Sequence, residues 1–190
     1  MSAPTNSADF DRAYRSPMTL WGDVRIPQEL KELARRQAGA PRTSLELGCG
    51  VGRLTRYVAQ QGLLATGVDF SPVAIAKARE RVARDPVQPQ FLVADATHLA
   101  ALTGPFDLAF DVGCFHCFDA HGQRAYVSEV SRLLKPSAVH LIWALDSAPC
   151  DLQLSPSYVK ELFAPSFKLQ AARKSLRRLA PSHWYWLVRT

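Results

Sequence analysis

Glycines and carboxylates stand at places in the first half of the chain where they could hold a polar ligand. Glu46 leads into a glycine-rich stretch, and Asp69 and Asp95 each follow a short apolar run. Glycine lets the backbone turn sharply and approach a ligand closely, because no Cβ stands in the way. A carboxylate about 20 positions beyond such a loop can accept hydrogen bonds from ribose hydroxyls. These residues therefore indicate a binding site for a ligand that carries a ribose.

The spacing of the glycine-rich stretch separates it from two better-known loops. The dinucleotide pattern needs a third glycine at position 53, where the chain has arginine. The phosphate-loop pattern ends in Gly-Lys-Ser/Thr, which this stretch lacks. What is present is an acidic residue followed by G-x-G-x-G, within the run Leu45-Glu46-Leu47-Gly48-Cys49-Gly50-Val51-Gly52-Arg53.

This run resembles motif I of the class I S-adenosylmethionine-dependent methyltransferases. The resemblance implies S-adenosylmethionine as cofactor and S-adenosylhomocysteine as product. It places Asp69 at the ribose, Phe70 against the adenine, and Asp95 with Ala96 at the adenine edge. Without the resemblance, Asp69 and Asp95 could equally be turn residues at strand ends. The resemblance extends from about Phe10 to Arg189, and the cofactor residues that it implies are Trp21, Glu46, Gly48, Cys49, Gly50, Gly52, Asp69, Phe70, Asp95, Ala96 and Asp111.

The elements that would position these residues alternate along the chain. Nearly continuous apolar strands between helices predict a parallel sheet covered on both faces. We expect an α/β, Rossmann-like, seven-stranded and mostly parallel sheet that ends in a C-terminal antiparallel hairpin. The predicted strands are Ser44–Leu47, Ala65–Val68, Gln90–Val93, Phe106–Phe110, Val139–Leu145, Phe167–Ala171 and Trp184–Val188. The predicted helices are Ile26–Ala38, Leu54–Gln61, Pro72–Arg84, Gln123–Leu134 and Pro156–Phe163.

Three local features refine this organisation. Ser71 and Ser155 each precede a proline, which puts a capping hydroxyl before the first helical position. Residues 10–25 carry apolar side chains without a regular pattern, and we expect them to be irregular and to fold over the rest of the chain. The family usually has two glycines after the proline of Lys135-Pro136, where this chain has Ser137 and Ala138, so that turn should differ slightly. We expect one methyltransferase domain over 1–190, with a lid segment over 1–25 and a cofactor-binding core over 26–190.

The loop after the fourth predicted strand holds the candidate for catalysis. Methyl transfer to a hydroxyl needs a base, whereas a thiol near its own pKa does not. In the resembling fold this loop faces the methyl group, so His116 is the candidate base; its alternative is packing beside the cofactor or capping a helix. Cys114 and Cys117 flank His116 in a C-x-x-C pair, but one pair without a second makes an incomplete zinc site. We therefore expect no metal.

The net charge of +6 is unevenly placed. From Lys168 onward the chain has six basic residues and no acidic one. This cluster could meet RNA or a membrane surface, or it could discourage pairing at an edge strand; the second interpretation suits so short a cluster better. No apolar run approaches the roughly 20 residues that cross a bilayer. With no targeting pattern at the N-terminus, we expect a cytoplasmic protein with no membrane or nucleic-acid partner.

We predict that the protein methylates a hydroxyl or thiol of a small, apolar or aromatic molecule. The alternatives are an RNA methyltransferase that uses the basic C-terminal region, and a non-catalytic cofactor-binding subunit. The Asn/Asp-Pro-Pro-aromatic motif of amino-group methylating branches does not match the run from Asp111 to Cys114. The paired glutamates of arginine-modifying enzymes are also missing near the fourth strand. The acceptor itself and the oligomeric state stay open.

Overall fold

The computed structural model describes residues 7–16, 25–37, 42–175 and 180–190. They form two compact units that divide after Asp95. As predicted, the longer strands make up a seven-stranded, mostly parallel sheet, to which the first unit contributes β3-β2-β1 and the second β4-β5-β9-β8.

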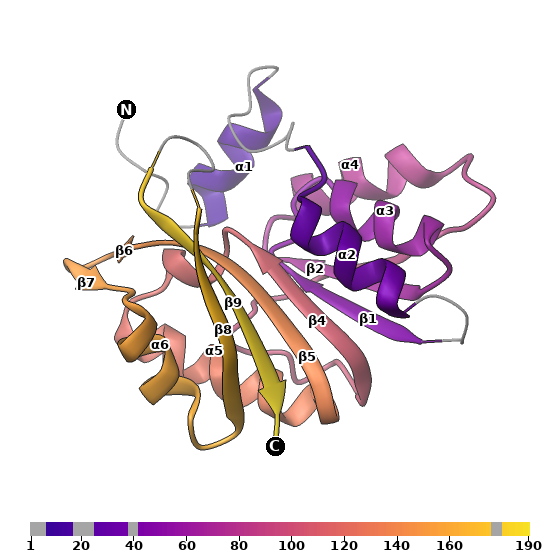
Figure 1. The fold of residues 1–190 in the computed structure, drawn as a ribbon. Helices are drawn as coiled ribbons and strands as arrows, with labels where there is room; N and C mark the ends of the chain where they lie inside the picture. Colours follow the sequence, from indigo (N-terminus) through magenta and orange to yellow (C-terminus); the bar gives the residue numbers. More distant parts are fainter. Residues whose placement is uncertain (1–6, 17–24, 38–41, 176–179) are drawn as a thin grey trace. The chain divides into compact units, whose positions relative to one another are not determined.

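The strands of the first unit are parallel and strongly apolar. β1 pairs with β2, and β2 with β3, so that Leu47 lies opposite Val68 and Val68 opposite Leu92. Their carboxyl ends therefore come together, which is where open α/β sheets bind ligands. The elements of this unit (Figure 1) are α1 Ser7–Arg15, α2 Gln28–Gln37, β1 Thr43–Leu47, α3 Arg53–Gln60, β2 Leu64–Asp69, α4 Pro72–Val82 and β3 Gln90–Val93.

Helix α4 begins as its sequence predicts, whereas the N-terminal segment of the chain differs from the prediction. The Ser71 hydroxyl accepts a hydrogen bond from the Ala74 amide, and Pro72 occupies the first helical turn. By contrast, residues 10–15 belong to helix α1, so the prediction of irregular structure over 10–25 was wrong for them; residues 17–24 lie outside the described residues. Phe10 and Tyr14 stand four positions apart, on one face of this helix, and that face packs against the unit.

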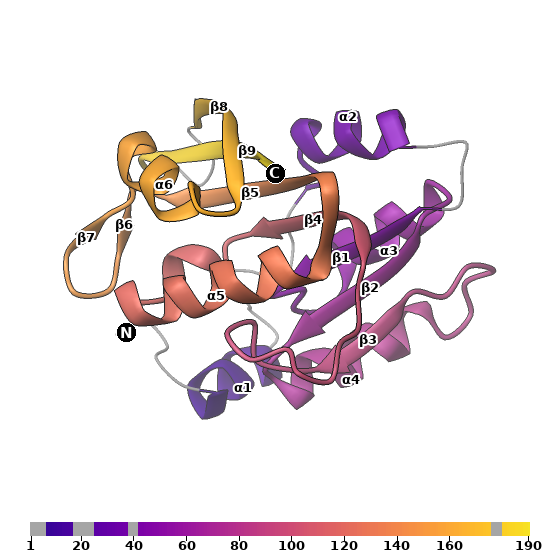
Figure 2. The same cartoon turned by 90° about the horizontal axis from the view of Figure 1, so that it is seen from below.

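The second unit combines a parallel pair of strands with an antiparallel hairpin. β4 and β5 are parallel, and β9 pairs antiparallel with both β5 and β8. Figure 2 shows α5 and α6 together on one face of these strands, where His140 of β5 contacts Tyr126 of α5 and Phe163 of α6. The elements are β4 Phe106–Val112, η1 Phe115–Cys117, α5 Ala120–Leu133, β5 Leu134–Leu145, β6 Ser147–Ala148, β7 Leu152–Gln153, α6 Pro156–Phe163, β8 Phe167–Ser175 and β9 Ser182–Arg189.

Strand β5 begins five residues earlier than predicted, at Leu134 instead of Val139. Leu134 pairs with Phe106, and the register then shifts so that Val139 pairs with Leu108. The residues between form a bulge in the ladder, which the sequence presents as a turn. Ser137 within it has a φ of 66°, a left-handed conformation that glycine adopts most readily.

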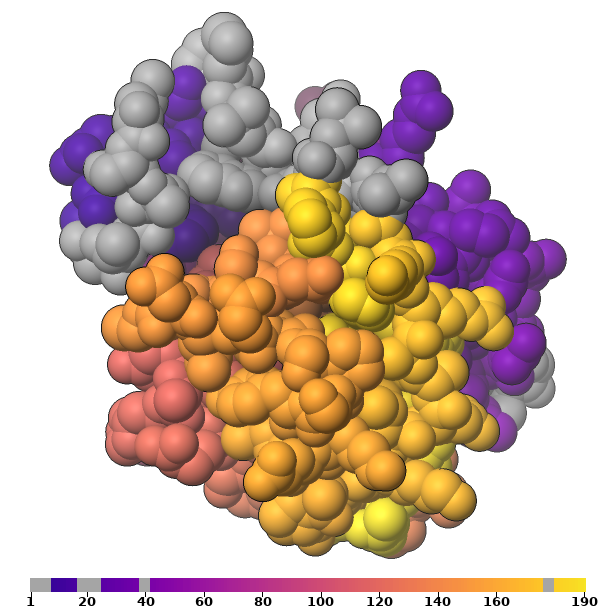
Figure 3. Space-filling view, turned by 60° about the vertical axis from the view of Figure 1, so that its left-hand side comes forward, coloured from indigo at the N-terminus to yellow at the C-terminus, as the bar shows by residue number. Residues whose placement is uncertain are grey.

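Strand β8 ends the order of strands in the second unit, and it lies at the surface in the gold region of Figure 3. Lys168 and Lys174 on β8 are exposed, and the Arg173 guanidinium lies 5.0 Å from the ring centre of Trp186. This agrees with the edge-strand interpretation of these charges; Arg177 and Arg178 lie outside the described residues. Across the described ranges, no helix combines the length and apolar character needed to cross a bilayer.

Candidate active site

The glycine-rich loop follows β1 and turns by left-handed backbone conformations. The φ values of Gly48, Gly50 and Gly52 are 67°, 52° and 74°. Residues other than glycine rarely adopt such values. The Cys49 amide donates to the Val68 carbonyl at 2.8 Å, so the loop continues the pairing of β1 with β2. The loop and the end of β2 are therefore held side by side.

Asp69 is the side chain that ties this loop to β2. Its Oδ2 accepts from the Gly50 amide at 2.8 Å and its Oδ1 accepts from the Ser71 amide at 2.9 Å. The residue is buried, and burial raises the pKa of its carboxyl group above the ordinary value. A carboxylate has about four lone-pair positions, so after these two bonds each oxygen can still accept one more donor.

Glu46 and Cys49 lie behind the loop. Glu46 is buried and accepts a hydrogen bond from the Thr55 hydroxyl of α3. Burial, then the charges of Glu46 and Asp69, raise the pKa of the Cys49 thiol well above its usual range. Cys49 is thus a neutral thiol in the wall of the site, and Glu46 anchors the loop to α3.

Helix α1 covers the loop and the end of β2. Phe10 meets Phe70 edge to face with ring centres 5.0 Å apart, and Asp11 accepts a hydrogen bond from the Ser71 hydroxyl. Tyr14 is buried against Val51. Its hydroxyl oxygen lies 2.8 Å from where a Cβ on Gly50 would be. Trp21, expected in the same covering segment, lies outside the described residues.

Two further predicted residues follow β3, beside the end of β2. The Ala94 amide donates to the Asp69 carbonyl at 3.0 Å, and Asp95 is exposed. Ala96 is buried and begins the second unit.

Asp111, at the end of β4, holds the loop that follows it. Its two oxygens accept from the Cys114 and Phe115 amides at 2.7 Å each, and Oδ2 also accepts from the Tyr126 hydroxyl at 3.1 Å. The residue is fully buried, which raises the pKa of its carboxyl group to about 7. Its role in cofactor binding stays a prediction, and these contacts assign it the positioning of the His116 loop.

His116 lies in the short helix η1 that Asp111 positions. Its Nδ1 accepts from the Leu145 amide at 3.3 Å, and its ring packs edge to face on Trp143. A neutral imidazole whose Nδ1 is an acceptor carries its proton on Nε2. The role of His116 as a base stays a prediction.

A second histidine, His183, was not a candidate in the sequence analysis. Its Nδ1 faces a carboxylate, whereas the Nδ1 of His116 faces an amide. His183 Nδ1 lies 2.6 Å from Asp146 Oδ1. Asp146 follows β5 directly, and His183 lies on β9 opposite Ala144, so both are at the carboxyl end of β5. With Nδ1–H donated to a carboxylate, the lone pair is on Nε2. The two residues are 37 positions apart, and only the pairing of β5 with β9 brings them together.

The cysteines add no further chemistry to this site. All four are free thiols, and Cys114 is half-buried while Cys117 is exposed. Within the described part of the chain, no three His, Cys, Asp or Glu side chains converge as metal ligands would.

Comparison with known proteins finds methyltransferases among the similar sequences and structures. Residues 45–137 match the family model of the methyltransferase domain. An uncharacterised methyltransferase of Schizosaccharomyces pombe is 32% identical over 89 residues, which are 47% of this chain and 61% of that protein. The 2-heptyl-1-hydroxyquinolin-4(1H)-one methyltransferase of Mycobacteroides abscessus is 30% identical over 105 residues, which are 55% of this chain and 46% of that protein. The chain thus spans about half the length of these curated relatives.

Solved structures share the fold over almost all of the chain. The 1,6-didemethyltoxoflavin-N1-methyltransferase of Burkholderia thailandensis, with bound 1,6-didemethyltoxoflavin and S-adenosylhomocysteine, has a TM-score of 0.77 and 20% identity. The match covers 100% of this chain and 93% of that one. Residues 45–137 thus match a methyltransferase domain model, and the chain shares its fold with the Burkholderia thailandensis methyltransferase.

Proposed function

We propose that this protein binds S-adenosylmethionine and transfers its methyl group to a hydroxyl or thiol of a small, apolar or aromatic molecule. The observation that carries the proposal is the bond between Asp69 and the Gly50 amide, which fixes a G-x-G-x-G loop against a carboxylate at adjacent strand ends. The spare lone pairs of Asp69 suit ribose hydroxyls, and the left-handed glycines let the loop turn sharply at the end of β1.

The bound cofactor would supply an already activated methyl group, so the protein's own work is alignment and exclusion of water. Helix α1 supports this proposal, because Phe10 and Tyr14 cover the end of β2 and the glycine loop. Asp11 and Ser71 bond across the same boundary. We infer that α1 belongs to the lid expected for residues 1–25.

The relatives favour a small aromatic acceptor. The names of the Mycobacteroides abscessus and Burkholderia thailandensis proteins both specify a small heteroaromatic substrate. A hydroxyl on such a molecule needs a base to remove its proton as the methyl group arrives. In the second unit, Asp146 and His183 form a candidate pair for this role: with Nδ1–H donated to the carboxylate, the Nε2 lone pair can accept a proton.

The cofactor site is tested by titrating the full chain with S-adenosylhomocysteine. Asp69→Ala should weaken binding at least roughly tenfold, because a hydrogen bond to a charged group contributes about 1.5–3 kcal/mol. Glu80→Gln, an exposed carboxylate on α4, is the matched control and should bind like the parent. Equal affinity in Asp69→Ala and the parent would remove Asp69 from the site.

The acceptor class is tested by incubating the protein and methyl-labelled cofactor with a cell lysate, then separating small molecules, protein and RNA. Label should enter the small-molecule pool. Label in RNA would instead support the alternative that uses the basic C-terminal region. Tight binding of the cofactor without transfer to any fraction would support the non-catalytic subunit.

The base is tested by His183→Gln once an acceptor is known. Turnover on a hydroxyl acceptor should fall about a hundredfold or more, while affinity for S-adenosylhomocysteine stays unchanged. Asp146→Asn should lower turnover in the same direction, and His121→Gln, an exposed histidine on α5, should not. If His116→Ala loses turnover and His183→Gln does not, His116 is the base after all.

A further inference from the structure

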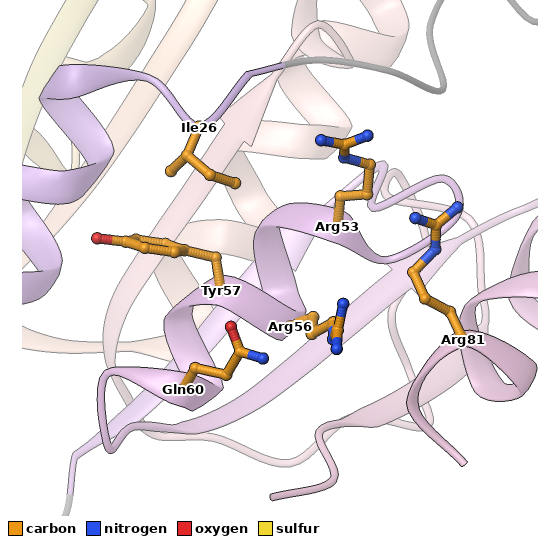
Figure 4. Close-up of a pocket in the computed structure, with 6 residues that line it drawn as sticks. All are labelled: Ile26, Arg53, Arg56, Tyr57, Gln60 and Arg81. Atoms are coloured by element: carbon orange, nitrogen blue, oxygen red, sulfur yellow. The ribbon is translucent and has the colours of Figure 1, made fainter. Parts of the chain in front are cut away.

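A pocket of about 280 Å³ lies on the first unit and is lined mainly by cationic and polar side chains. Figure 4 shows the guanidinium groups of three arginines on one side of it, and Ile26, Tyr57 and Gln60 on the other. Helix α3 contributes four of the lining residues, α4 contributes Arg81, and Ile26 comes from the segment before α2. The lining residues are Ile26, Arg53, Arg56, Tyr57, Gln60 and Arg81.

One of the arginines is held rigidly. Asp85 pairs with Arg56 through two bonds, Nε to Oδ2 at 2.5 Å and Nη2 to Oδ1 at 2.8 Å. A two-point pair fixes the plane of a guanidinium, so less side-chain entropy is lost when it binds a further group. Arg56 therefore forms a fixed wall of the pocket.

Arg81 adds a further positive charge to the pocket. No carboxylate in the described part of the chain forms an ion pair with Arg81. Partial burial, then the charges of Arg53 and Arg56, lower the pKa of Arg81. Like charges held this close repel each other, and a bound anion would relieve that repulsion.

We propose that this pocket binds the phosphate group of a small phosphorylated molecule. Guanidinium groups match the geometry of phosphate oxygens, and several of them together are typical of phosphate recognition. Gln60 adds an amide, while Tyr57 and Ile26 offer an apolar surface for the organic part of the ligand. The volume is close to the lower end of ordinary ligand sites, about 300 Å³, which suits a small molecule.

The surroundings favour a compact anion over a nucleic-acid backbone. A polynucleotide needs a row of cations along its track. Here Asp85 stands beside Arg56, and Glu80 stands beside Arg81 in the neighbouring depression that Lys77 completes. These carboxylates would repel a strand that continued past the pocket, whereas a single phosphate group avoids them.

The test is calorimetric titration of the full chain with inorganic phosphate, pyrophosphate and a short single-stranded RNA at one ionic strength. Pyrophosphate should bind, and Arg53→Gln and Arg81→Gln should each weaken it at least roughly tenfold. Arg84→Gln, an exposed arginine beyond the end of α4, is the control and should bind pyrophosphate like the parent.

Three results would overturn the proposal: no binding of phosphate or pyrophosphate at millimolar concentration, equal binding by Arg81→Gln and the parent, or RNA that binds more tightly and is lost in the same variants. Arg81→Gln should keep the parent's affinity for S-adenosylhomocysteine. That second titration separates failure of this pocket from failure of the proposed methyl transfer and also shows that the variant is folded.

Discussion

At the scale of single residues, the positions of the glycine-rich loop require glycine for different physical reasons. A Cβ on Gly52 would lie 2.5 Å from the Phe91 ring and 2.9 Å from the Ala78 Cβ, inside the first unit. Gly52 is therefore required for packing between the loop, α4 and β3, as well as for its left-handed φ. The G-x-G-x-G pattern alone could not separate this role from ligand binding, because both demand the same residue type.

Gly52→Ala should lower the free energy of unfolding by about 3 kcal/mol, from the left-handed backbone and from overpacking against Phe91. Gly62→Ala is the matched control, since Gly62 has a φ of 92° but nothing near its Cβ position. It should cost only the backbone part, about 1–2 kcal/mol. Urea denaturation of both variants measures the difference. Equal losses would mean that Phe91 gives way and that packing does not require Gly52.

At the scale of elements, the sequence predicts best where periodicity and caps agree. The strands at the glycine loop and the helices that begin at Ser71 and Ser155 are confirmed. Helix α1 was missed because nine residues hold too few apolar positions to show a period, and its stability comes from packing on the unit. The early start of β5 was missed because residues 135–138 have turn composition while Leu134 already pairs with Phe106.

Ser137→Gly should stabilise the protein by about 0.5–1 kcal/mol. A side chain at a φ of 66° costs roughly 1–2 kcal/mol, and glycine removes that cost but loses part of the gain to the greater freedom of the unfolded chain. Ser147→Gly, at an exposed serine in β6, is the control and should be neutral or slightly destabilising. Thermal unfolding decides between them. A Ser137→Gly variant no more stable than the parent would show that the bulge is not strained.

At the scale of the whole molecule, the limit of sequence-based prediction is distance along the chain. The glycine loop, Asp69 and Phe70 were predictable as a group because a short strand–loop–helix motif and the next strand end contain them. The pairing of Asp146 with His183 and the meeting of Arg53 with Arg81 depend on strand register and helix packing. No local sequence pattern predicts such contacts, because in the sequence each of these residues has the type of an ordinary surface residue.

Long-range packing also couples two titrating groups through one tyrosine. The Tyr126 hydroxyl lies 3.1 Å from Asp111 Oδ2 and 2.9 Å from His140 Nε2. All three side chains are fully buried. Burial raises the pKa of Asp111 to about 7 and lowers that of His140 to about 4, so each group resists becoming charged inside the protein.

The two shifts have opposite effects on stability. Between about pH 4 and pH 7 the folded state holds the Asp111 proton that the unfolded state releases, so this group lowers stability as pH rises. Between about pH 4 and the ordinary histidine pKa of about 6.5, the unfolded state holds a proton that folded His140 lacks, so this group raises stability as pH rises. In the parent protein these two contributions largely cancel over that range.

His140→Gln should therefore expose the slope that belongs to Asp111. Glutamine keeps a polar group near Tyr126 but does not titrate, so the free energy of unfolding should fall as pH rises from about 4 to 7, by about 1.4 kcal/mol for each pKa unit of the Asp111 shift. Urea denaturation of both proteins across this range measures the two slopes, and their difference is the His140 contribution. His121→Gln, at an exposed histidine, should leave the parent's profile unchanged. A His140→Gln profile parallel to that of the parent would contradict the prediction, because it would mean that His140 takes up a proton as readily in the folded protein as in the unfolded chain.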